Sequence, residues 1–240
     1  MPTPLLLLAH PGHELRLFGW MEQERPLVCI LTDGSGSVAP PRTALSLALL
    51  AACGAQAGPV LGWLPDRAWY AALLAGDATP FLAAADSIAA ATPAGTLVVA
   101  DPVEGYNPMH DLAAAVADRV ALLVGGRRAT YPLMQPQPGP GGLALDRAAQ
   151  QRKLAAIAAY APLAQEAAAL LRADPAALAQ EKVVPHRHDW PAQPARRPEY
   201  ESIGAGRSAA GVYARTITYA EHVRPMALRL RAPLAMRATA

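Results

Sequence analysis

The segment Pro4–Glu14 has the sequence PLLLLAHPGHE, in which an apolar run is followed by two histidines and a glutamate. Its unbroken apolar run, which ends at a Pro-Gly step, is typical of a strand that is buried on both faces of a parallel sheet. Polar residues follow the run at once. Because ligands bind beyond the carboxyl ends of parallel strands, the segment predicts a central strand that leads directly into a functional site.

Further apolar runs alternate with helical patterns through the first half of the chain. We expect strands at residues 27–31, 59–63, 96–100 and 120–124. We expect helices at residues 42–53, 67–75, 80–91 and 109–118. This alternation predicts an α/β, Rossmann-like fold, with a mostly parallel sheet and helices on both of its faces.

The second half of the chain has a different character. A loop rich in proline and glycine follows Tyr131, and a long helix is expected over residues 146–171, with a bend at Pro162. Residues 183–198 look irregular, and residues 210–219 fit either an edge strand or a helix. We therefore expect one domain over residues 1–240, with an α/β core at 1–131 and a helical and irregular elaboration at 132–240.

The composition excludes several classes of protein. The 240 residues are 52% hydrophobic and 17% charged, and 21 basic against 19 acidic residues give a net charge of +2. Intrinsic disorder and general nucleic-acid binding are therefore not expected. The only cysteines, Cys29 and Cys53, lack the spacing of a disulfide framework or a cysteine zinc site.

The opening apolar run is too short for a membrane span, which needs about 20 residues. It also lacks the basic start of a signal peptide. We expect no membrane span and a cytoplasmic location. The sequence leaves the oligomeric state open, a homo-oligomer included.

Three histidines follow two of the expected strands. His10 and His13 are three residues apart at a turn after the first strand, and His110 follows the strand at residues 96–100. The spacing lets two imidazoles point toward one centre, and three protein ligands with an open fourth position are typical of catalytic zinc. The alternative is that the first two histidines only form hydrogen bonds at the turn.

The loop after the second strand favours a competing function. Residues 34–39, with the sequence GSGSVA, formally fit the GxGxxA fingerprint of dinucleotide binding. However, Pro40 and Pro41 follow immediately, where the fingerprint requires a helix. We therefore favour another explanation of Gly34 and Gly36, in which they form a turn or let the backbone approach a site closely.

The combined motifs resemble the zinc-dependent LmbE-like (PIG-L) N-acetylglucosaminyl deacetylases. The resemblance rests on LLLLAHPGHE at residues 5–14, LTDG at 31–34 and GYNPMHD at 105–111, with further similarity at 61–66, 153–165, 198–201 and 211–213. It implies a Rossmann-like fold and hydrolysis of the acetamide on an amino sugar, or of a related amide. The implied partner is a small-molecule N-acyl amino sugar or glycoconjugate, and the implied cofactor is zinc, with another divalent metal as an alternative.

The resemblance also implies site residues. The metal ligands would be His10, His13 and His110. His13 stands where the family's HPDDE motif has its second aspartate. The family's general base would be at position 12, which is Gly12 in this chain. The residue that assists the transition state would be Asn107. We expect the more cationic zinc to compensate partly for the missing base by holding a more acidic water.

Other polar residues have candidate roles near this site. Glu14 and Asp111 are candidate substitute bases, and Asp101 and Glu104 are candidates to orient His110.

Arg42 is a candidate to hold a substrate hydroxyl or phosphate, or it is an exposed residue at a helix start. Asp66 either binds sugar hydroxyls or caps a helix, and Asn107 either polarises the substrate carbonyl or forms a turn. His186 and His188 belong to a lid, a solvated loop or a second metal site.

The sequence is compatible with three functions. The leading interpretation is a metal-dependent amide hydrolase, and the second is a degenerate relative that binds metal or sugar without turnover. A nucleotide-binding module comes last.

Overall fold

The computed structural model describes residues 2–36, 39–133, 142–165, 168, 178–186 and 188–232. Its centre is a six-stranded sheet in the order β3-β2-β1-β4-β5-β8. All neighbouring strands pair in parallel except β8, which is antiparallel to β5. The bounds are β1 (Leu5–Leu8), β2 (Leu27–Thr32), β3 (Gln56–Leu64), β4 (Leu97–Ala100), β5 (Arg127–Thr130) and β8 (Val184–Pro185). The predicted fold class is confirmed.

The central strand β1 explains why its sequence is apolar without alternation. Leu5 and Leu7 face one hydrophobic core, whereas Leu6 and Leu8 face the other, and all four side chains are fully buried. Since successive side chains of a strand point to opposite faces, a strand covered on both sides needs an apolar residue at every position.

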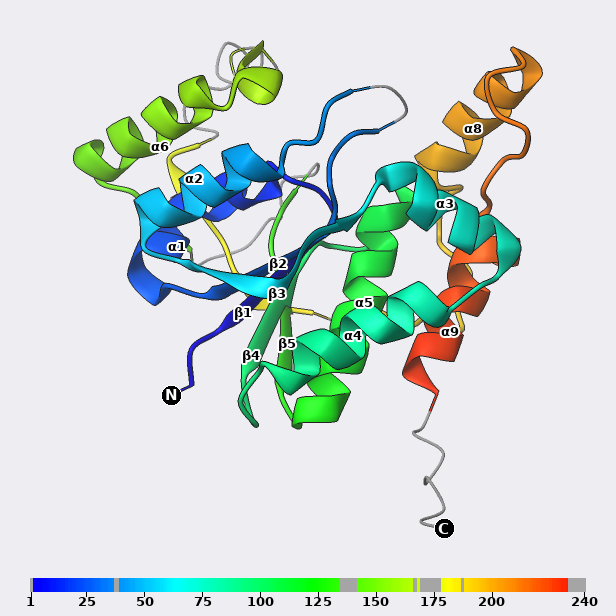
Figure 1. Ribbon diagram of the computed structural model, residues 1–240, viewed down its shortest axis with the longest axis horizontal. Helices are drawn as coiled ribbons and strands as arrows, with labels where there is room; N and C mark the ends of the chain where they lie inside the picture. Colours follow the sequence, from blue (N-terminus) through cyan, green and yellow to red (C-terminus); the bar gives the residue numbers. More distant parts are fainter. Residues whose placement is uncertain are drawn as a thin grey trace.

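Helices cover both faces of the sheet (Figure 1). One core contains residues of α1 (Phe18–Glu24), α2 (Thr43–Cys53) and α6 (Arg147–Ala159). The other core contains residues of α3 (Asp66–Ala75), α4 (Thr79–Ala90), α5 (Pro108–Val124), the π-helix η2 (Tyr219–Val223) and α9 (Arg224–Arg231). Both cores therefore meet at β1, whose carboxyl end opens into the first site loop.

The strand that the sequence predicts at residues 120–124 is wrong, because these residues form the last turns of α5. This helix is 17 residues long and is buried on almost all sides, so it lacks the polar stripe by which a surface helix is recognised. Gly125 ends it in the left-handed conformation, with φ of 60°. The fifth strand is β5, which begins with two arginines and so gives no apolar signal.

The second half also differs from the prediction. Helix α6 ends at Ala159, three residues before Pro162, whose nitrogen has no N–H to continue the helical hydrogen bonds. Residues 161–165 are helical again, and most of residues 166–177 lie outside the described part. Residues 211–218 form neither a strand nor a helix, and α8 (Glu199–Ala209) was not predicted.

A buried ion pair attaches the second half to the core. The carboxylate of Glu181, in the short strand β7 (Gln180–Glu181) that pairs with β6 (Leu143–Ala144), lies 2.7 Å from Lys153 Nζ in α6. It also accepts hydrogen bonds from the amides of Gly19 and Trp20 in α1. Both charged side chains are almost completely buried, so each depends on the other for charge compensation.

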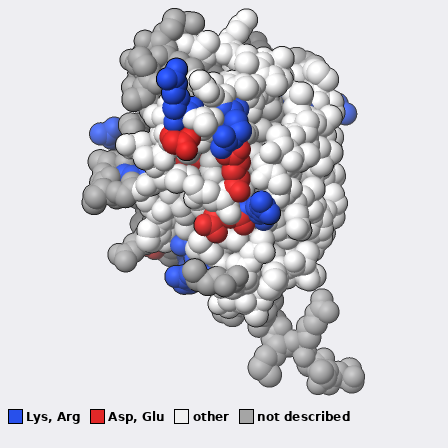
Figure 2. Space-filling view, turned by 90° about the vertical axis from the view of Figure 1, so that its left-hand side faces the viewer, with Lys and Arg blue, Asp and Glu red and all other residues white. Residues whose placement is uncertain are grey.

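The surface over α1 and α6 carries acidic and basic side chains that are interspersed rather than segregated (Figure 2). Arg152 in α6 forms hydrogen bonds of 2.7 Å and 2.9 Å to the two carboxylate oxygens of Glu22 in α1. Within the described residues, no helix is long and apolar enough to cross a membrane.

We expect Lys153→Ala to lower the free energy of unfolding by about 3–5 kcal/mol, because it leaves the Glu181 carboxylate buried without a cation. Urea denaturation measures this loss. The neighbouring substitution Arg152→Ala, which breaks an exposed ion pair, is the control and should change stability little. Equal losses in the two variants would contradict the role given to the buried pair.

Candidate functional site

Three histidines from two distant segments meet at the carboxyl edge of the sheet. His10 follows β1, His13 begins the 3-10 helix η1 (His13–Leu17), and His110 lies in the first turn of α5. The ring centres are 5.4 Å apart for His10 and His13, 5.2 Å for His10 and His110, and 4.6 Å for His13 and His110. The structure therefore brings the three predicted ligands together.

Two of the histidines have a carboxylate partner on Nδ1. His10 Nδ1 lies 3.0 Å from Asp66 Oδ1 and 2.9 Å from the Thr32 hydroxyl, and His13 Nδ1 lies 2.9 Å from Asp101 Oδ2. A carboxylate at Nδ1 keeps the proton on that nitrogen and leaves Nε2 with a free lone pair. Asp66 and Asp101 thus orient His10 and His13. The sequence suggested helix capping or substrate binding for Asp66, and it suggested His110 as the partner of Asp101.

Burial fixes the charge states in the cluster. It lowers the pKa of His10, and it lowers the pKa of His110 well below the usual value, so both rings are neutral near pH 7. Burial alone would raise the pKa of Asp66 and Asp101, but hydrogen bonds and charges from the adjacent histidines bring each to about 2. The imidazoles of His10 and His110 are therefore neutral beside the ionised carboxylates of Asp66 and Asp101.

The chemistry of the donors fits a metal ion. His10 Nε2 and His110 Nδ1 are buried and have no hydrogen-bond partner within the described part of the chain. Three imidazoles bound to one zinc, with Zn–N distances of about 2.0–2.1 Å, place their ring centres about 5 Å apart, close to the separations seen. No group of three or more His, Cys, Asp or Glu among the described residues already has the arrangement of a metal site. We therefore expect the rings to turn when an ion binds.

Glu14 lies beneath the first loop and stabilises it. Its carboxylate accepts hydrogen bonds from the Gly12 amide, at 2.7 Å, and from the Ser46 hydroxyl. The side chain is fully buried, and burial raises its pKa. These contacts favour a structural role over that of a substitute base.

Asp111 stabilises the loop before α5 in a similar way. Its Oδ1 accepts hydrogen bonds from the amides of Glu104 and Gly105, and burial raises its pKa to about 7. Its Oδ2 and the hydroxyl of Tyr200 are buried without a described partner. Glu104, the other carboxylate of this loop, accepts a hydrogen bond from the Leu133 amide.

Asn107 presents its amide nitrogen at the start of α5. Its Oδ1 caps the helix by accepting a hydrogen bond from the Met109 amide at 2.8 Å, and it also accepts one from the Tyr70 hydroxyl at 3.1 Å. Since both bonds use the oxygen, Nδ2 keeps its two hydrogens for another acceptor. Tyr70 could not be identified from the sequence, because its contact with Asn107 joins positions 37 residues apart.

The turn after β2 does not resemble a phosphate-binding loop. The amides of Gly34, Ser35 and Gly36 donate to side-chain oxygens of Thr32, Asp33 and Asp66, respectively. A phosphate cradle needs such amides to be free, and a helix that begins at the loop. Helix α2 begins only at Thr43.

Arg42 lies at the border between this turn and the helix. Its Nε donates to the Gly34 carbonyl at 3.0 Å, while its terminal guanidinium nitrogens have no described partner. The substrate-binding role that the sequence suggests for Arg42 stays a prediction.

Gly12 lies against side chains from the second half of the chain. It has φ of 108°, and a Cβ added there would lie 2.3 Å from Leu163 Cδ1 and 3.5 Å from the Tyr160 ring. The space beside Gly12 is therefore occupied by Leu163, a residue that sequence reasoning did not single out. A carboxylate at position 12 would require Leu163 to move.

His186 and His188 lie outside the cluster. His186 Nε2 is 3.7 Å from Asp118 Oδ1, and His188 Nε2 is 3.4 Å from the Tyr219 hydroxyl. Asp118 follows His110 by eight residues of α5, which is about 12 Å along the helix. These two histidines are thus separate from the three rings.

The chain matches no protein-family model and no curated protein. Among solved structures it is similar to the crystal structure of the antimicrobial reagent A40926 pseudoaglycone deacetylase Dbv21, with a TM-score of 0.48 and 18% sequence identity. The likeness covers 77% of this chain and 97% of that chain. Function must therefore be argued from the site itself.

We expect Gly12→Ala to lower the free energy of unfolding by about 2–5 kcal/mol, from the left-handed backbone and from the clash with Leu163. Gly76→Ala is the comparison, because Gly76 also has a positive φ, of 65°, but a Cβ added there would meet none of the described residues within 4 Å. Chemical denaturation measures the loss in both variants. Only the first loss should shrink when Leu163→Ala is already present. Identical behaviour of the two glycines would show that Leu163 does not fill this space.

Proposed function

We propose that this protein is a metal-dependent amide hydrolase that removes an N-acyl group, acetyl in our expectation, from an amino sugar or its conjugate. The observation that carries the proposal is the meeting of His10, His13 and His110, with buried nitrogens on two of the rings that have no partner among the described residues. The resemblance of residues 5–14, 31–34 and 105–111 to the LmbE-like deacetylases supports the amide and amino-sugar parts of the proposal.

The three imidazoles would hold the metal ion, and zinc suits them best. Neutral nitrogen donors are preferred ligands of zinc, and three of them leave a further position for water or substrate. A zinc ion bound there would supply Lewis acidity and would lower the pKa of the water that it binds.

The chain's own residues would prepare this chemistry. Asp66 and Asp101 hold the Nδ1 protons of His10 and His13, so that Nε2 of each ring is the donor atom. The Nδ2 group of Asn107, next to the α5 start that carries His110, would donate to the oxygen of the amide carbonyl as negative charge develops on it. The free guanidinium nitrogens of Arg42 would bind a hydroxyl or acidic group of the substrate.

One observation favours a second function, in which the protein binds a metal or a sugar without turnover. Gly12 has no side chain to accept a proton, and Leu163 fills the adjoining space. Of the carboxylates that the sequence offers nearby, Glu14 and Asp111 are engaged by backbone amides. General base catalysis contributes about 10²–10⁴-fold, so its loss would leave either a slow enzyme or an inactive binder.

Metal analysis and product release together test the proposal. We expect about one zinc per chain by elemental analysis and chelator-sensitive acetate release from N-acetylglucosamine conjugates. In His110→Ala we expect weaker zinc binding and loss of acetate release. His188→Ala, which removes a histidine outside the cluster, should keep the metal and the activity.

A parent protein without stoichiometric divalent metal would refute the metal site. Stoichiometric metal without acyl release from any conjugate would favour binding without turnover.

Asn107→Asp separates the capping role of Asn107 from its catalytic role. Aspartate still accepts the Met109 amide, so α5 should keep its stability, but it lacks the N–H donors. We expect kcat to fall by about 10²–10³-fold with an unchanged midpoint of thermal unfolding. A variant with parental kcat would remove Asn107 from the reaction.

A further inference from the structure

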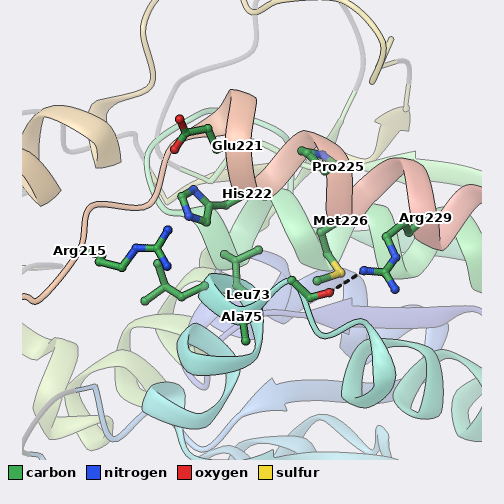
Figure 3. Close-up of a pocket in the computed structure, with 10 residues that line it drawn as sticks. Leu73, Ala75, Arg215, Glu221, His222, Pro225, Met226 and Arg229 are labelled. Atoms are coloured by element: carbon green, nitrogen blue, oxygen red, sulfur yellow. Dashed lines mark hydrogen bonds between the residues drawn. The ribbon is translucent and has the colours of Figure 1, made fainter.

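A cavity of about 470 Å³ lies between the carboxyl end of α3 and the η2–α9 segment (Figure 3). Helix α3 begins at Asp66, which contacts His10, and its ten residues span about 15 Å. The cavity lies at the other end of this helix, so it is distinct from the histidine cluster. The proposed hydrolase activity assigns it no role.

His222 presents a hydrogen-bond donor to this cavity. The residue is only 7% exposed, and its Nδ1 accepts a hydrogen bond from the Thr218 amide at 3.1 Å. Because an amide can only donate, Nδ1 must carry the lone pair, and the proton of the neutral ring must be on Nε2. Nε2 has no hydrogen-bond partner within the described part of the chain, so this N–H is free to donate to a ligand in the cavity.

Two arginines bring positive charge to the lining of the cavity, and Asp77, outside the lining, interacts electrostatically with one of them, Arg229. Arg215 is exposed and forms no ion pair or hydrogen bond with the described residues, and Figure 3 shows its guanidinium beside the His222 ring. Arg229 donates one hydrogen bond to the Gly76 carbonyl and keeps its other donors. Glu221 is the one carboxylate among the lining residues, and in Figure 3 it lies on the opposite side of His222 from Arg215.

Between the two arginines, the cavity is lined by apolar side chains. Leu73 and Met226 are almost completely buried beneath it, whereas Leu74, Ala75 and Pro225, which also line it, keep accessible apolar surface. Inorganic anions gain nothing from such a surface, whereas a carboxylate with an apolar body would cover it.

We propose that this cavity binds a small organic carboxylate. Its oxygens would lie between the Arg215 guanidinium and the Nε2–H of His222, and its apolar body would cover the accessible surface of Leu74, Ala75 and Pro225. A charge-assisted hydrogen bond from a guanidinium is among the stronger polar contacts, so Arg215 would provide much of the affinity.

Calorimetric titration with benzoate tests this site. We expect saturable binding of one benzoate per chain, weakened at least tenfold by Arg215→Ala. Arg147→Ala is the matched control, because Arg147 is also an exposed arginine without a described partner but belongs to α6, far from α9 in Figure 1. It should bind benzoate like the parent.

Two further readouts decide the proposal. The ¹⁵N shifts of the His222 ring should show the Nε2–H tautomer and should change on titration with benzoate. No saturable binding up to about 10 mM benzoate, or equal affinity in Arg215→Ala and the parent, would overturn the proposal. Equally tight binding of inorganic phosphate and benzoate would also overturn it, because the apolar surface would then contribute nothing.

Discussion

One buried carboxylate, that of Asp101, joins the parts on which the site depends. It accepts hydrogen bonds from the Ala9 amide at the end of β1 and from the Tyr131 hydroxyl beyond β5, and it lies 2.9 Å from His13 Nδ1. A fully buried charge is stable only when its partners are in place. Asp101, which follows β4, therefore both links the ends of β1 and β4 and orients His13. The fold and the site depend on the same carboxylate.

The first loop shows how the local backbone conformation and distant packing shape the site. Gly12 has a backbone conformation that side chains disfavour, and Leu163 closes the space beside it. The third side chain beside His10 and His110 is the imidazole of His13 and not a carboxylate. A metal ion among these rings would keep its full charge, which lowers the pKa of a bound water and reduces the need for a separate base.

The sequence predicted the central strands and the meeting of three histidines because both depend on local signals: apolar runs and polar residues directly after them. Residues 120–124 were misassigned because α5 is buried on nearly all sides, so apolar content there no longer distinguishes a helix from a strand. The contacts of Asp66 with His10 and of Leu163 with Gly12 join positions 56 and 151 residues apart. Neither contact has a signature in the residues around it, so only the folded chain reveals them.

X-ray absorption at the zinc edge of the metal-loaded protein tests the central claim most directly. If three imidazoles bind one ion, the spectrum should show nitrogen neighbours at about 2.0–2.1 Å and the outer-shell scattering of three imidazole rings. In zinc-loaded His110→Ala, the outer-shell scattering should correspond to two rings. A spectrum with oxygen neighbours only, or one that His110→Ala leaves unchanged, would show that the three rings do not share a metal ion.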